Sequence, residues 1–577
     1  METKTQLLME KDQQIKRKMT GSHAVMQSLL CEGVDLMFGY PGGAIMPVYD
    51  ALYDYKDKIH HVLVRHEQGA VHAAQGYARV TGKVGVCIVT SGPGATNAIT
   101  GIAVAMIDST PMVVISGQVT SALLGTDAFQ ETDVVGITQP ITKWNYQVKR
   151  AEEIPEAISR AFYIARTGRP GPVLIDITKD AQASMMEFEY KKTTLIRSYT
   201  PAIKPDADKI AEAARLINLA KKPLILVGQG VVLGNAEKEL IELIDKSGIP
   251  SAWTLLGLSA FPTDHPLNVG MLGMHGNYGA NVKTNQADLV IAIGMRFDDR
   301  VTGNAKAYAT NAKVIHFEID PAEINKIIYA DVPVLGNVKD TLPLITKLVD
   351  ARKHDQWLAE FRVCDKIEDE KIIQEQLNPT KPGLTMGEVV RKVSEAYNND
   401  AIMITDVGQH QMFASRYFKF KQTRSVVTSG GLGTMGFGLP AAIGAKMGRP
   451  DRPVVLFVGD GGFQMTIQEL GTIFQTKIPV KIVLLNNNFL GMVRQWQELF
   501  YDKRYASTEL INPDFQMIGK GYGLDVEKVE ERANLDDAIQ RMIESDNAYL
   551  LEVVVEKEGN VFPMVPSGAS VSDIRLE

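Results

Sequence analysis

Cysteine is scarce in this sequence, with Cys31, Cys87 and Cys364 the only three among 577 residues. Three widely separated cysteines without a C-x-x-C pair predict neither a disulfide framework nor a zinc site, and a reducing compartment suits them best. Apolar runs of the roughly 18 residues that a membrane helix needs are also missing. The opening residues carry several acidic side chains and no apolar segment typical of a signal peptide. We therefore predict a cytoplasmic protein that does not cross a membrane.

Basic clusters are missing too, apart from the short stretch of Lys16, Arg17 and Lys18. The formal net charge of -7 is modest for this length, so nucleic acid is not an expected partner. Hydrophobic residues make up 45% and charged residues 22%, which is typical of a globular protein with sizeable cores. A chain of 577 residues is too long for one core, so we expect three domains.

Three sections of the chain alternate short apolar runs with amphipathic stretches. This alternation predicts an α/β fold with three doubly wound parallel-sheet domains. The first and third sections are alike only in this general pattern, which is weak support for a shared fold. The runs are VCIVTSGPG, PMVVISGQ and PVLIDIT in the first section, KPLILVGQG, ADLVIAIGMRFDD and KVIHFEID in the second, and AIMITDVG, RPVVLFVGDGG and VKIVLLNNN in the third.

Composition also indicates where the domains end. The polar segment from Ala351 to Pro382 predicts a helix and a linker before the third section. The closing stretch NVFPMVPSGASVSDIRLE holds proline, glycine and serine without periodicity, which indicates a covering segment or a mobile end. We expect an N-terminal extension at 1–19, domains at 20–195, 196–375 and 376–560, and a C-terminal tail at 561–577.

The strongest chemical motif joins the ends of two predicted strands. Asp460 lies in a Gly-Asp-Gly turn after VVLFV, and Asn487 lies 27 positions later in an Asn-Asn pair after IVLL. A carboxylate and a side-chain amide, with a nearby backbone carbonyl, suit Mg²⁺ that also binds phosphates. The glycines allow a diphosphate to approach the backbone. The alternative is that both motifs are ordinary turns, since such dipeptides are common after strands.

A competing motif, G-x-G-x-x-G at Gly431, Gly433 and Gly436, follows a short predicted strand. It imitates a dinucleotide fingerprint in which Asp460, after the next strand, would hold a ribose. The protein would then be an NAD-linked oxidoreductase. Against this hypothesis, the glycine run continues beyond the fingerprint, and the Asn-Asn pair stays unexplained.

The Gly-Asp-Gly turn followed by the Asn-Asn pair resembles the cofactor signature of thiamine-diphosphate enzymes. The resemblance implies a pyrimidine-binding first domain and a third domain that binds the diphosphate and Mg²⁺. Asp460, Asn487 and the backbone carbonyl of Phe489 would coordinate the Mg²⁺. Met435 would hold the cofactor bent between its rings. The other residues implied near the cofactor are Gly408, Gln409, His410, Gly433, Gly459, Gly461 and Gly462.

The same family requires a glutamate in the first domain, and Glu67 in VRHEQGAVHAAQGYAR matches it. Its carboxylate would favour the imino tautomer of the aminopyrimidine, whose nitrogen then removes the proton from the thiazolium carbon. The alternative for an isolated glutamate is a solvated surface charge. By this resemblance Glu67 is the first catalytic candidate.

Within that superfamily the chain resembles the acetolactate (acetohydroxyacid) synthases over nearly its whole length. FGYPGGAIMPVYDAL, GTDAFQETD, GMRFDDRVTG and NNNFLGMVRQWQ carry the resemblance. It implies that pyruvate is decarboxylated and its two-carbon unit joined to pyruvate or 2-ketobutyrate, giving 2-acetolactate or 2-aceto-2-hydroxybutyrate. This step opens the biosynthesis of valine, leucine and isoleucine. A catabolic acetolactate synthase and a pyruvate oxidase-like enzyme are the alternatives.

In the biosynthetic relatives the central domain binds FAD, which takes no net part in the carboligation. The resemblance therefore implies a central FAD-binding domain here, and RFDDRVTG favours it. A central domain without flavin, as in the catabolic relatives, is the alternative. The residues expected against FAD are Gly273, Met274, His275, Gly276, Arg296 and Asp298.

Two residues are implied to select the second ketoacid. Arg300 would hold its carboxylate, because a guanidinium fork suits that group. The alternative for Arg300 is a salt bridge to Asp298 or Asp299. Trp496 would favour 2-ketobutyrate through contact with its extra methyl group, worth about 1 to 3 kcal/mol.

Other residues are implied at the reaction centre. Gln130 would line it as a second catalytic residue. Phe129 and Met274 would form apolar walls that exclude water. Lys179 matches a residue of the substrate channel, although a surface lysine is an equally simple interpretation. No histidine is assigned an essential role.

Family architecture places Glu67 and the diphosphate signature of one site on two subunits. The resemblance therefore implies a homodimer or a homotetramer. It also implies a separate small regulatory subunit, since this chain holds no extra domain for feedback. The expected small-molecule ligands are pyruvate, 2-ketobutyrate, thiamine diphosphate, Mg²⁺ and FAD.

Overall fold

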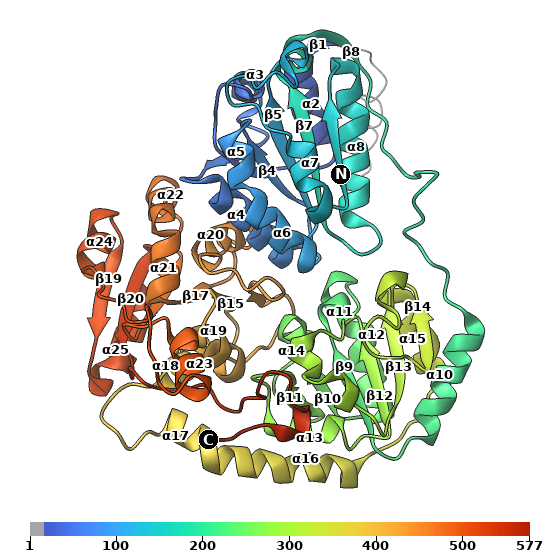
Figure 1. Cartoon of the computed structure of the whole chain (residues 1–577), viewed down its shortest axis with the longest axis vertical. Coiled ribbons are helices and arrows are strands. Elements are labelled where there is room, and N and C mark those ends of the chain that lie inside the picture. Colours follow the sequence, from blue (N-terminus) through green and yellow to red (C-terminus); the bar gives the residue numbers. More distant parts are fainter. Residues whose placement is uncertain (1–16) are drawn as a thin grey trace.

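The computed structural model describes residues 17–577 and contains three six-stranded parallel sheets with helices on their faces (Figure 1). This confirms the predicted fold class. Between residues 17 and 577 no helix is both long and apolar enough to cross a bilayer. Most of the expected N-terminal extension lies outside the described residues, and its predicted boundary falls inside β1 (Arg17–Thr20), which pairs with β8 (Met185–Phe188).

The first sheet has the strand order β3-β2-β4-β5-β7-β6. Strands β4, β5 and β7 are buried along their whole length, as expected when helices cover both faces. The order reverses between β2 and β4, and in such sheets ligands bind beyond the strand ends at this point. The elements are α2 Gly21–Cys31, β2 Leu36–Gly39, α3 Met46–Leu52, β3 His60–Leu63, α4 Glu67–Thr81, β4 Gly85–Val89, α5 Pro93–Asn97, α6 Ile99–Ile107, β5 Met112–Gln118, α7 Val134–Thr138, β6 Trp144–Val148, α8 Ile154–Arg166, β7 Pro172–Thr178 and α9 Lys179–Ala183.

The third sheet, β16-β15-β17-β18-β20-β19, repeats the topology of the first. Numbered within its own domain, each sheet has the order 2-1-3-4-6-5, so the two domains share a fold that the sequence pattern supported only weakly. The elements are α18 Met386–Ala396, β15 Ile402–Thr405, α19 Gln409–Tyr417, β16 Val426–Val427, α20 Gly438–Gly448, β17 Val454–Gly459, α21 Asp460–Met465, α22 Leu470–Thr476, β18 Lys481–Asn486, α23 Gly491–Phe500, α24 Phe515–Gly521, β19 Asp525–Val529, α25 Leu535–Glu544 and β20 Tyr549–Val554.

The central sheet, β11-β10-β9-β12-β13-β14, has the order 3-2-1-4-5-6 that is typical of dinucleotide-binding folds. Its switch point lies between β9 and β12. The helix and linker predicted from composition are present as α16, a π-helical turn over 369–373, and α17, which run along the lower edge of Figure 1. The elements are α10 Ala207–Leu219, β9 Pro223–Val227, α11 Gln229–Leu233, α12 Glu237–Ser247, β10 Ser251–Trp253, β11 Asn268–Met271, α13 Tyr278–Thr284, β12 Leu289–Ile293, α14 Asp299–Thr302, β13 Lys313–Glu318, β14 Val332–Leu335, α15 Val338–Leu348, α16 Asp355–Glu368 and α17 Gln374–Leu377.

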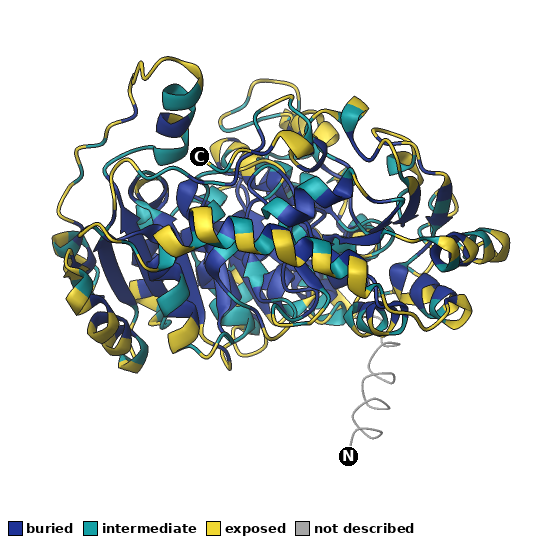
Figure 2. Ribbon diagram, turned by 90° about the horizontal axis from the view of Figure 1, so that it is seen from below, coloured by how far each residue is buried: buried dark blue, intermediate teal, exposed yellow. Residues whose placement is uncertain are grey.

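Helix α4 of the first domain packs directly on α20 of the third. A Cβ atom on Gly76 would lie 2.0 Å from the carbonyl oxygen of Ala441, and one on Gly444 would lie 1.8 Å from that of Ala73. Only glycine permits this approach of two backbones. Side chains from both domains form one continuous core around the two helices. Figure 2 shows the buried residues at the centre of the molecule and the exposed outer faces of the surrounding helices.

Gly444→Ala is expected to destabilise the protein by about 1 to 3 kcal/mol, because the added methyl group forces the two helices apart. Differential scanning calorimetry of the variant would measure the change. Gly521→Ala is the matched control, since a Cβ atom at that helical glycine meets nothing within 4 Å. Equal unfolding temperatures for the two variants would contradict the close packing of α4 on α20.

Candidate active site

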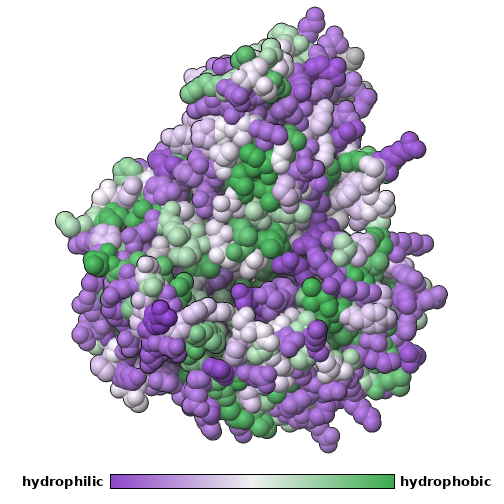
Figure 3. Space-filling view, viewed as in Figure 1, coloured by the Kyte–Doolittle hydropathy of each residue, from purple (hydrophilic) through white to green (hydrophobic). Residues whose placement is uncertain are grey.

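A cavity of about 1020 Å³ opens where the three domains meet. The first domain contributes Ser109 and Arg169 to its wall. The central domain contributes residues after β9 and β12, where the strand order of that sheet reverses. Figure 3 shows apolar side chains gathered on the face where the upper domain meets the lower two. Predicted site residues that line the cavity are Gly273, Met274, His275, Arg296, Asp298, Arg300, Gly408, Gly433, Met435 and Trp496.

The Gly-Asp-Gly turn and the Asn-Asn pair lie side by side at the carboxyl edge of the third sheet. Strands β17 and β18 pair in parallel with Gly459 opposite Leu485, so Asp460 and Asn486 follow directly at neighbouring positions. Asp460 is only 1% exposed, and burial raises the pKa of its carboxyl group to about 6. A buried carboxylate of this kind is well suited to a cation.

The donors at this edge suit Mg²⁺. Asn487 is buried, and its Oδ1 accepts the backbone N–H of Phe489 at 3.2 Å, which folds the turn and places the Phe489 backbone beside the amide. Among residues 17–577 no group of three or more His, Cys, Asp or Glu side chains could hold a metal ion. A site here therefore depends on one carboxylate, an amide and a carbonyl, leaving coordination positions for phosphate and water.

Polar groups at the start of α19 face the same edge. Gly408 adopts a φ of 147°, and the imidazole of His410 packs against it and against Gly459. Burial lowers the pKa of His410 to about 3, so the ring is neutral, and its buried Nε2 atom has no hydrogen-bond partner. The Gln409 amide donates to Gln495 Oε1 at 3.0 Å and to Gly559 O at 2.9 Å. The unpartnered ring nitrogen is consistent with a ligand at this edge of the sheet.

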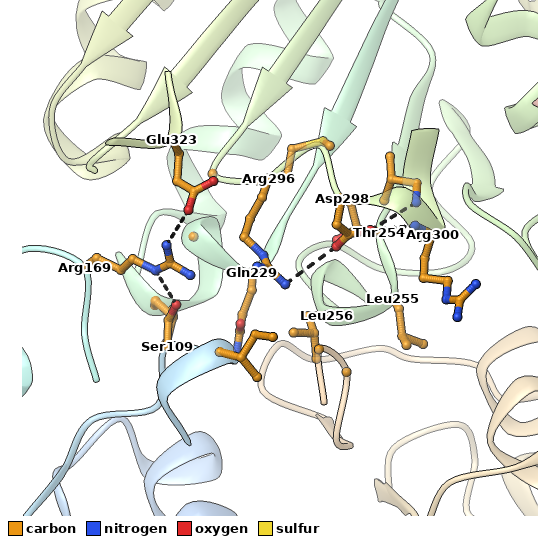
Figure 4. A pocket seen from close by; sticks show the side chains of 18 of the residues that line it. Ser109, Arg169, Gln229, Thr254, Leu255, Leu256, Arg296, Asp298, Arg300 and Glu323 are labelled. Carbon is orange, nitrogen blue, oxygen red and sulfur yellow. Dashed lines mark hydrogen bonds and ion pairs between the residues drawn. The ribbon is translucent and has the colours of Figure 1, made fainter. Parts of the chain in front are cut away.

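The RFDDR segment follows β12 and forms one wall. Asp298 caps α14 by accepting the N–H groups of Arg300 and Val301, and it lies 3.8 Å from the Arg296 guanidinium (Figure 4). Burial raises the pKa of Asp298, while Arg296 lowers it. The Arg300 side chain is 58% exposed and reaches Asp299 only at 3.8 Å. Since such an exposed pair is weak, the guanidinium is available to an anion.

The segment from Gly273 to Gly276 follows β11 and contacts the RFDDR segment. Met274 donates its N–H to Arg300 O at 2.7 Å, which places its side chain beside the Arg300 guanidinium. Burial lowers the pKa of His275 to about 4, and the buried Nδ1 atom of that ring has no partner. Gly276 does not line the cavity, although its N–H closes the turn onto Gly273 O.

The C-terminal tail is hydrogen-bonded to both the central and the third domain. Val565 donates its N–H to Met274 O at 2.8 Å, and Asn304 donates to Ala569 O at 2.8 Å. Near the start of the tail, Gln495 exchanges hydrogen bonds with both backbone groups of Val561. The tail thus connects α23 of the third domain with the wall that carries Arg300. These hydrogen bonds favour a covering segment over a mobile end.

Four further predicted residues lie at the carboxyl edge of the first sheet, and they do not line the cavity, as Asp460 and Asn487 of the third sheet edge do not. Glu67 opens α4, and its Oε2 atom accepts an N–H from Asn97 at 2.9 Å. Gln130 has a φ of 60° and packs on Gly92, Lys179 begins α9, and Phe129 is 87% exposed. Buried hydroxyls of Thr90, Ser91 and Thr178 have no hydrogen-bond partner at this edge. The edge is therefore built of polar groups that lack a ligand or a facing surface.

Three stretches of the chain match thiamine pyrophosphate enzyme families. They are the N-terminal TPP binding domain at residues 19–137, the central domain at 210–345 and the C-terminal TPP binding domain at 406–553. Curated relatives are similar over nearly the whole chain. An acetolactate synthase large subunit from Corynebacterium glutamicum is 47% identical over 567 residues, which cover 97% of this chain and 90% of the relative. The large subunit from Lactococcus lactis is 44% identical, and the match covers 96% of that relative. The large subunit of isozyme 2 from Escherichia coli is 45% identical, and the match covers 99% of it.

The chain belongs to the acetolactate synthase large-subunit family. Membership confirms the resemblance inferred from the Gly-Asp-Gly turn and the RFDDR segment, and it makes the chain a thiamine-diphosphate-dependent enzyme. The hypothesis of an NAD-linked oxidoreductase is wrong. At the start of its glycine segment, the N–H groups that would face a dinucleotide phosphate instead donate to a carboxylate. Those of Gly430 and Gly431 donate to Asp108.

Two buried acidic residues that hold segments lining the cavity were missed from the sequence. Asp406, fully buried after β15, accepts the N–H groups of Val407, Gly436 and Gly438 and so shapes the segment that carries Met435. Its position after the apolar run AIMIT was the available signal. Asp108 shapes the adjacent glycines from another domain, which no local pattern reveals.

Arg169 was missed as well. It lies in the cavity wall and donates from Nε to Ser109 Oγ at 2.9 Å and from Nη1 to Glu323 Oε1 at 2.8 Å (Figure 4). These contacts connect the first domain to the central domain beside the cavity. The only local signal was an arginine between glycine and proline in TGRPGP, a pattern typical of many turns.

Proposed function

We propose that this chain is the catalytic subunit of a biosynthetic acetolactate synthase. It decarboxylates pyruvate and joins the two-carbon unit to a second pyruvate or to 2-ketobutyrate, the first common step toward valine, leucine and isoleucine. The observation that carries the proposal is one cavity lined by Gly408 and Met435 as well as by Trp496 and Arg300. It would connect the proposed diphosphate side of the third domain with a cationic group for a ketoacid carboxylate.

The third domain would hold Mg²⁺ and the diphosphate. Asp460, Asn487 and the carbonyl of Phe489 supply the oxygen donors that Mg²⁺ prefers. Gly408 and His410 would lie along the diphosphate, where a neutral, unpartnered ring nitrogen is available. Gly433 leaves room for a ligand, whereas Gly459, Gly461 and Gly462 allow His410, Leu490 and Asp406 to pack closely at this edge. When bound, thiamine diphosphate supplies the nucleophilic carbon and the electron sink for decarboxylation.

Glu67 would hold a proton shared with the pyrimidine ring. The first residue of α4 is a good position for a carboxylate, because the helix N-terminus stabilises its charge. Asn97 fixes the orientation of the group through its bond to Oε2. Gln130 and Phe129 follow on the same sheet edge, where Gln130 would contact the reacting atoms and Phe129 would exclude water.

A second copy of the chain would complete the site. Glu67, Gln130 and Lys179 do not line the cavity that holds Trp496 and Arg300, which supports a site completed by the first domain of a second copy. The exposed ring of Phe129 and the unpartnered hydroxyls at the first sheet edge are consistent with a covering subunit. A homodimer is therefore the smallest complete enzyme, with tetramers and a separate small regulatory subunit as further assemblies.

The central domain would hold FAD as a structural cofactor. Its strand order is typical of dinucleotide-binding folds, and the cavity continues across the switch point between β9 and β12. Arg296 and Arg169 offer cationic groups along that wall, and the unpartnered Nδ1 of His275 is a further polar contact. Gly273 and Gly276 keep the neighbouring turn narrow. A FAD-free catabolic enzyme would leave this part of the cavity without a role.

Trp496→Leu is expected to reduce the preference for 2-ketobutyrate over pyruvate by about tenfold, because one methyl contact is worth about 1 to 3 kcal/mol. Competition between the two acceptors, followed by quantifying both products, measures this preference. Phe500→Leu is the control, since that ring packs on Trp496 at 5.4 Å but does not line the cavity. An unchanged product ratio in Trp496→Leu would exclude Trp496 from acceptor selection.

Product analysis tests the proposed function. The purified chain is incubated with pyruvate, thiamine diphosphate, Mg²⁺ and FAD, and the products are identified by NMR. Acetolactate with one carbon dioxide released per two pyruvates is the expected result. Acetate or acetyl phosphate as the main product would instead assign the chain to the oxidases.

A further inference from the structure

Asn512 lies between α23 and α24 and brings together the two turns that carry the proposed metal ligands. Its Nδ2 atom has three oxygen acceptors, Asp460 Oδ2 at 2.7 Å, Asn486 Oδ1 at 3.1 Å and Asn488 Oδ1 at 3.0 Å. One side chain therefore contacts the ends of both β17 and β18. Asn512 differs from the proposed ligands Asp460, Asn487 and Phe489, because it presents an N–H donor to this edge and not a coordinating oxygen.

The orientation of this amide is fixed from outside. Gln464 donates from Nε2 to Asn512 Oδ1 at 3.0 Å and to the carbonyl oxygen of Asp460 at 3.0 Å. A flipped amide would place Oδ1 against three oxygen atoms and the NH₂ group against that of Gln464. Since both ends of the amide have complementary partners only in this orientation, its NH₂ group points at the metal edge.

The backbone around Asn512 supports the same edge. Leu510 donates its N–H to Asn488 O at 2.9 Å, and Leu490 donates to Thr508 O at 2.8 Å. These bonds pair residues 508–510 with the turn that carries Phe489. The paired segment follows α23, which carries Trp496.

We propose that Asn512 is a positioning residue for Mg²⁺, acting through Asp460 and the turn of Asn487 and Phe489. By donating to Asp460 Oδ2 it fixes the plane of the carboxylate, and by donating to Asn486 and Asn488 it fixes the two residues that flank Asn487. Partners of metal ligands typically change metal affinity by about 10- to 100-fold when they are removed. The inference rests on the proposed Mg²⁺ site.

Removing the Asn512 side chain should have little effect on the stability of the metal-free protein. Asn512 is partly exposed and the neighbouring side chain of Ile511 is fully exposed, so the segment contributes little to the core. Loss of the amide should therefore leave the metal-free protein folded. The loss should instead weaken Mg²⁺ binding. A purely structural residue would lower the stability of the metal-free protein as well.

The test compares Asn512→Ala with the wild type by titrating Mg²⁺ at fixed thiamine diphosphate in a calorimeter. The Kd for Mg²⁺ is expected to rise about 10- to 100-fold, while the unfolding temperature without Mg²⁺ changes little and excess Mg²⁺ restores turnover. Asn547→Ala is the matched control, because that amide also donates to a carboxylate of the third domain, that of Asp525, away from the metal edge. Its Kd should equal that of the wild type.

A second variant keeps the test decisive if Asn512→Ala does not fold. Gln464→Met changes an exposed side chain and removes the donor that orients Asn512, together with its bond to the Asp460 carbonyl oxygen but not the Asn512 amide itself, so a smaller rise in the same Kd is expected. A Kd within twofold of the wild type in whichever variant folds would overturn the inference. So would a loss of turnover that excess Mg²⁺ does not restore. A wild type without Mg²⁺-dependent cofactor binding would instead overturn the proposed function.

Discussion

A Glu67→Gln chain is expected to turn over pyruvate about 10²- to 10⁴-fold more slowly than the wild type while still binding thiamine diphosphate and FAD. Glutamine keeps the shape of the side chain and can still bond to Asn97, but it cannot share a proton as a carboxylate does. Steady-state kinetics and cofactor titrations separate the two effects. Glu156→Gln, which removes an exposed carboxylate paired with Arg160, is the control and should keep full turnover. Undiminished turnover in Glu67→Gln would exclude its catalytic role.

Asp460→Asn is expected to weaken Mg²⁺ binding by at least about 100-fold and to abolish turnover at ordinary Mg²⁺ concentrations, because Asp460 is the one carboxylate among the proposed ligands. The flavin spectrum should stay unchanged, since FAD would bind in the central domain. Asp502→Asn, in an exposed loop, is the control. Normal Mg²⁺ affinity in Asp460→Asn would place the metal elsewhere.

Mixing these two inactive chains tests the shared site. In a heterodimer, the first domain of the Asp460→Asn chain and the third domain of the Glu67→Gln chain form one intact site. Random pairing of equal amounts then restores about a quarter of the wild-type activity, since half of the dimers are mixed and each has one intact site. No recovery in dimers shown to be mixed would mean that each chain builds its own site.

The sequence was sufficient for the fold class because apolar runs ending in glycine turns are a local signal. The runs before Asp460 and Asn487 are β17 and β18, and their ends meet because parallel strands share an edge. The strand orders could not be obtained in this way, since order depends on which strands pair. The likeness of the first and third sheets therefore became clear only from their topology.

Contacts made between distant parts of the chain could not be predicted from the sequence. Asp108 binds the glycines near Met435 from a position more than 300 residues earlier, and Asn512 reaches two strand ends from a loop. Nothing local distinguishes either side chain from a turn residue. The assigned roles of the site residues, and the domain boundaries at 195, 375 and 560, stay predictions that the experiments above address.

The most direct test of the central claim is acetolactate formation by the purified chain with thiamine diphosphate, Mg²⁺ or FAD omitted in turn, while the flavin spectrum is recorded. We predict that omitting any one of the three abolishes acetolactate and that the complete mixture forms it without lasting reduction of the flavin. Acetolactate formed without FAD would identify a catabolic type of enzyme. Flavin bleached by pyruvate would contradict the account, because it would show an oxidase in which the flavin takes part in the reaction.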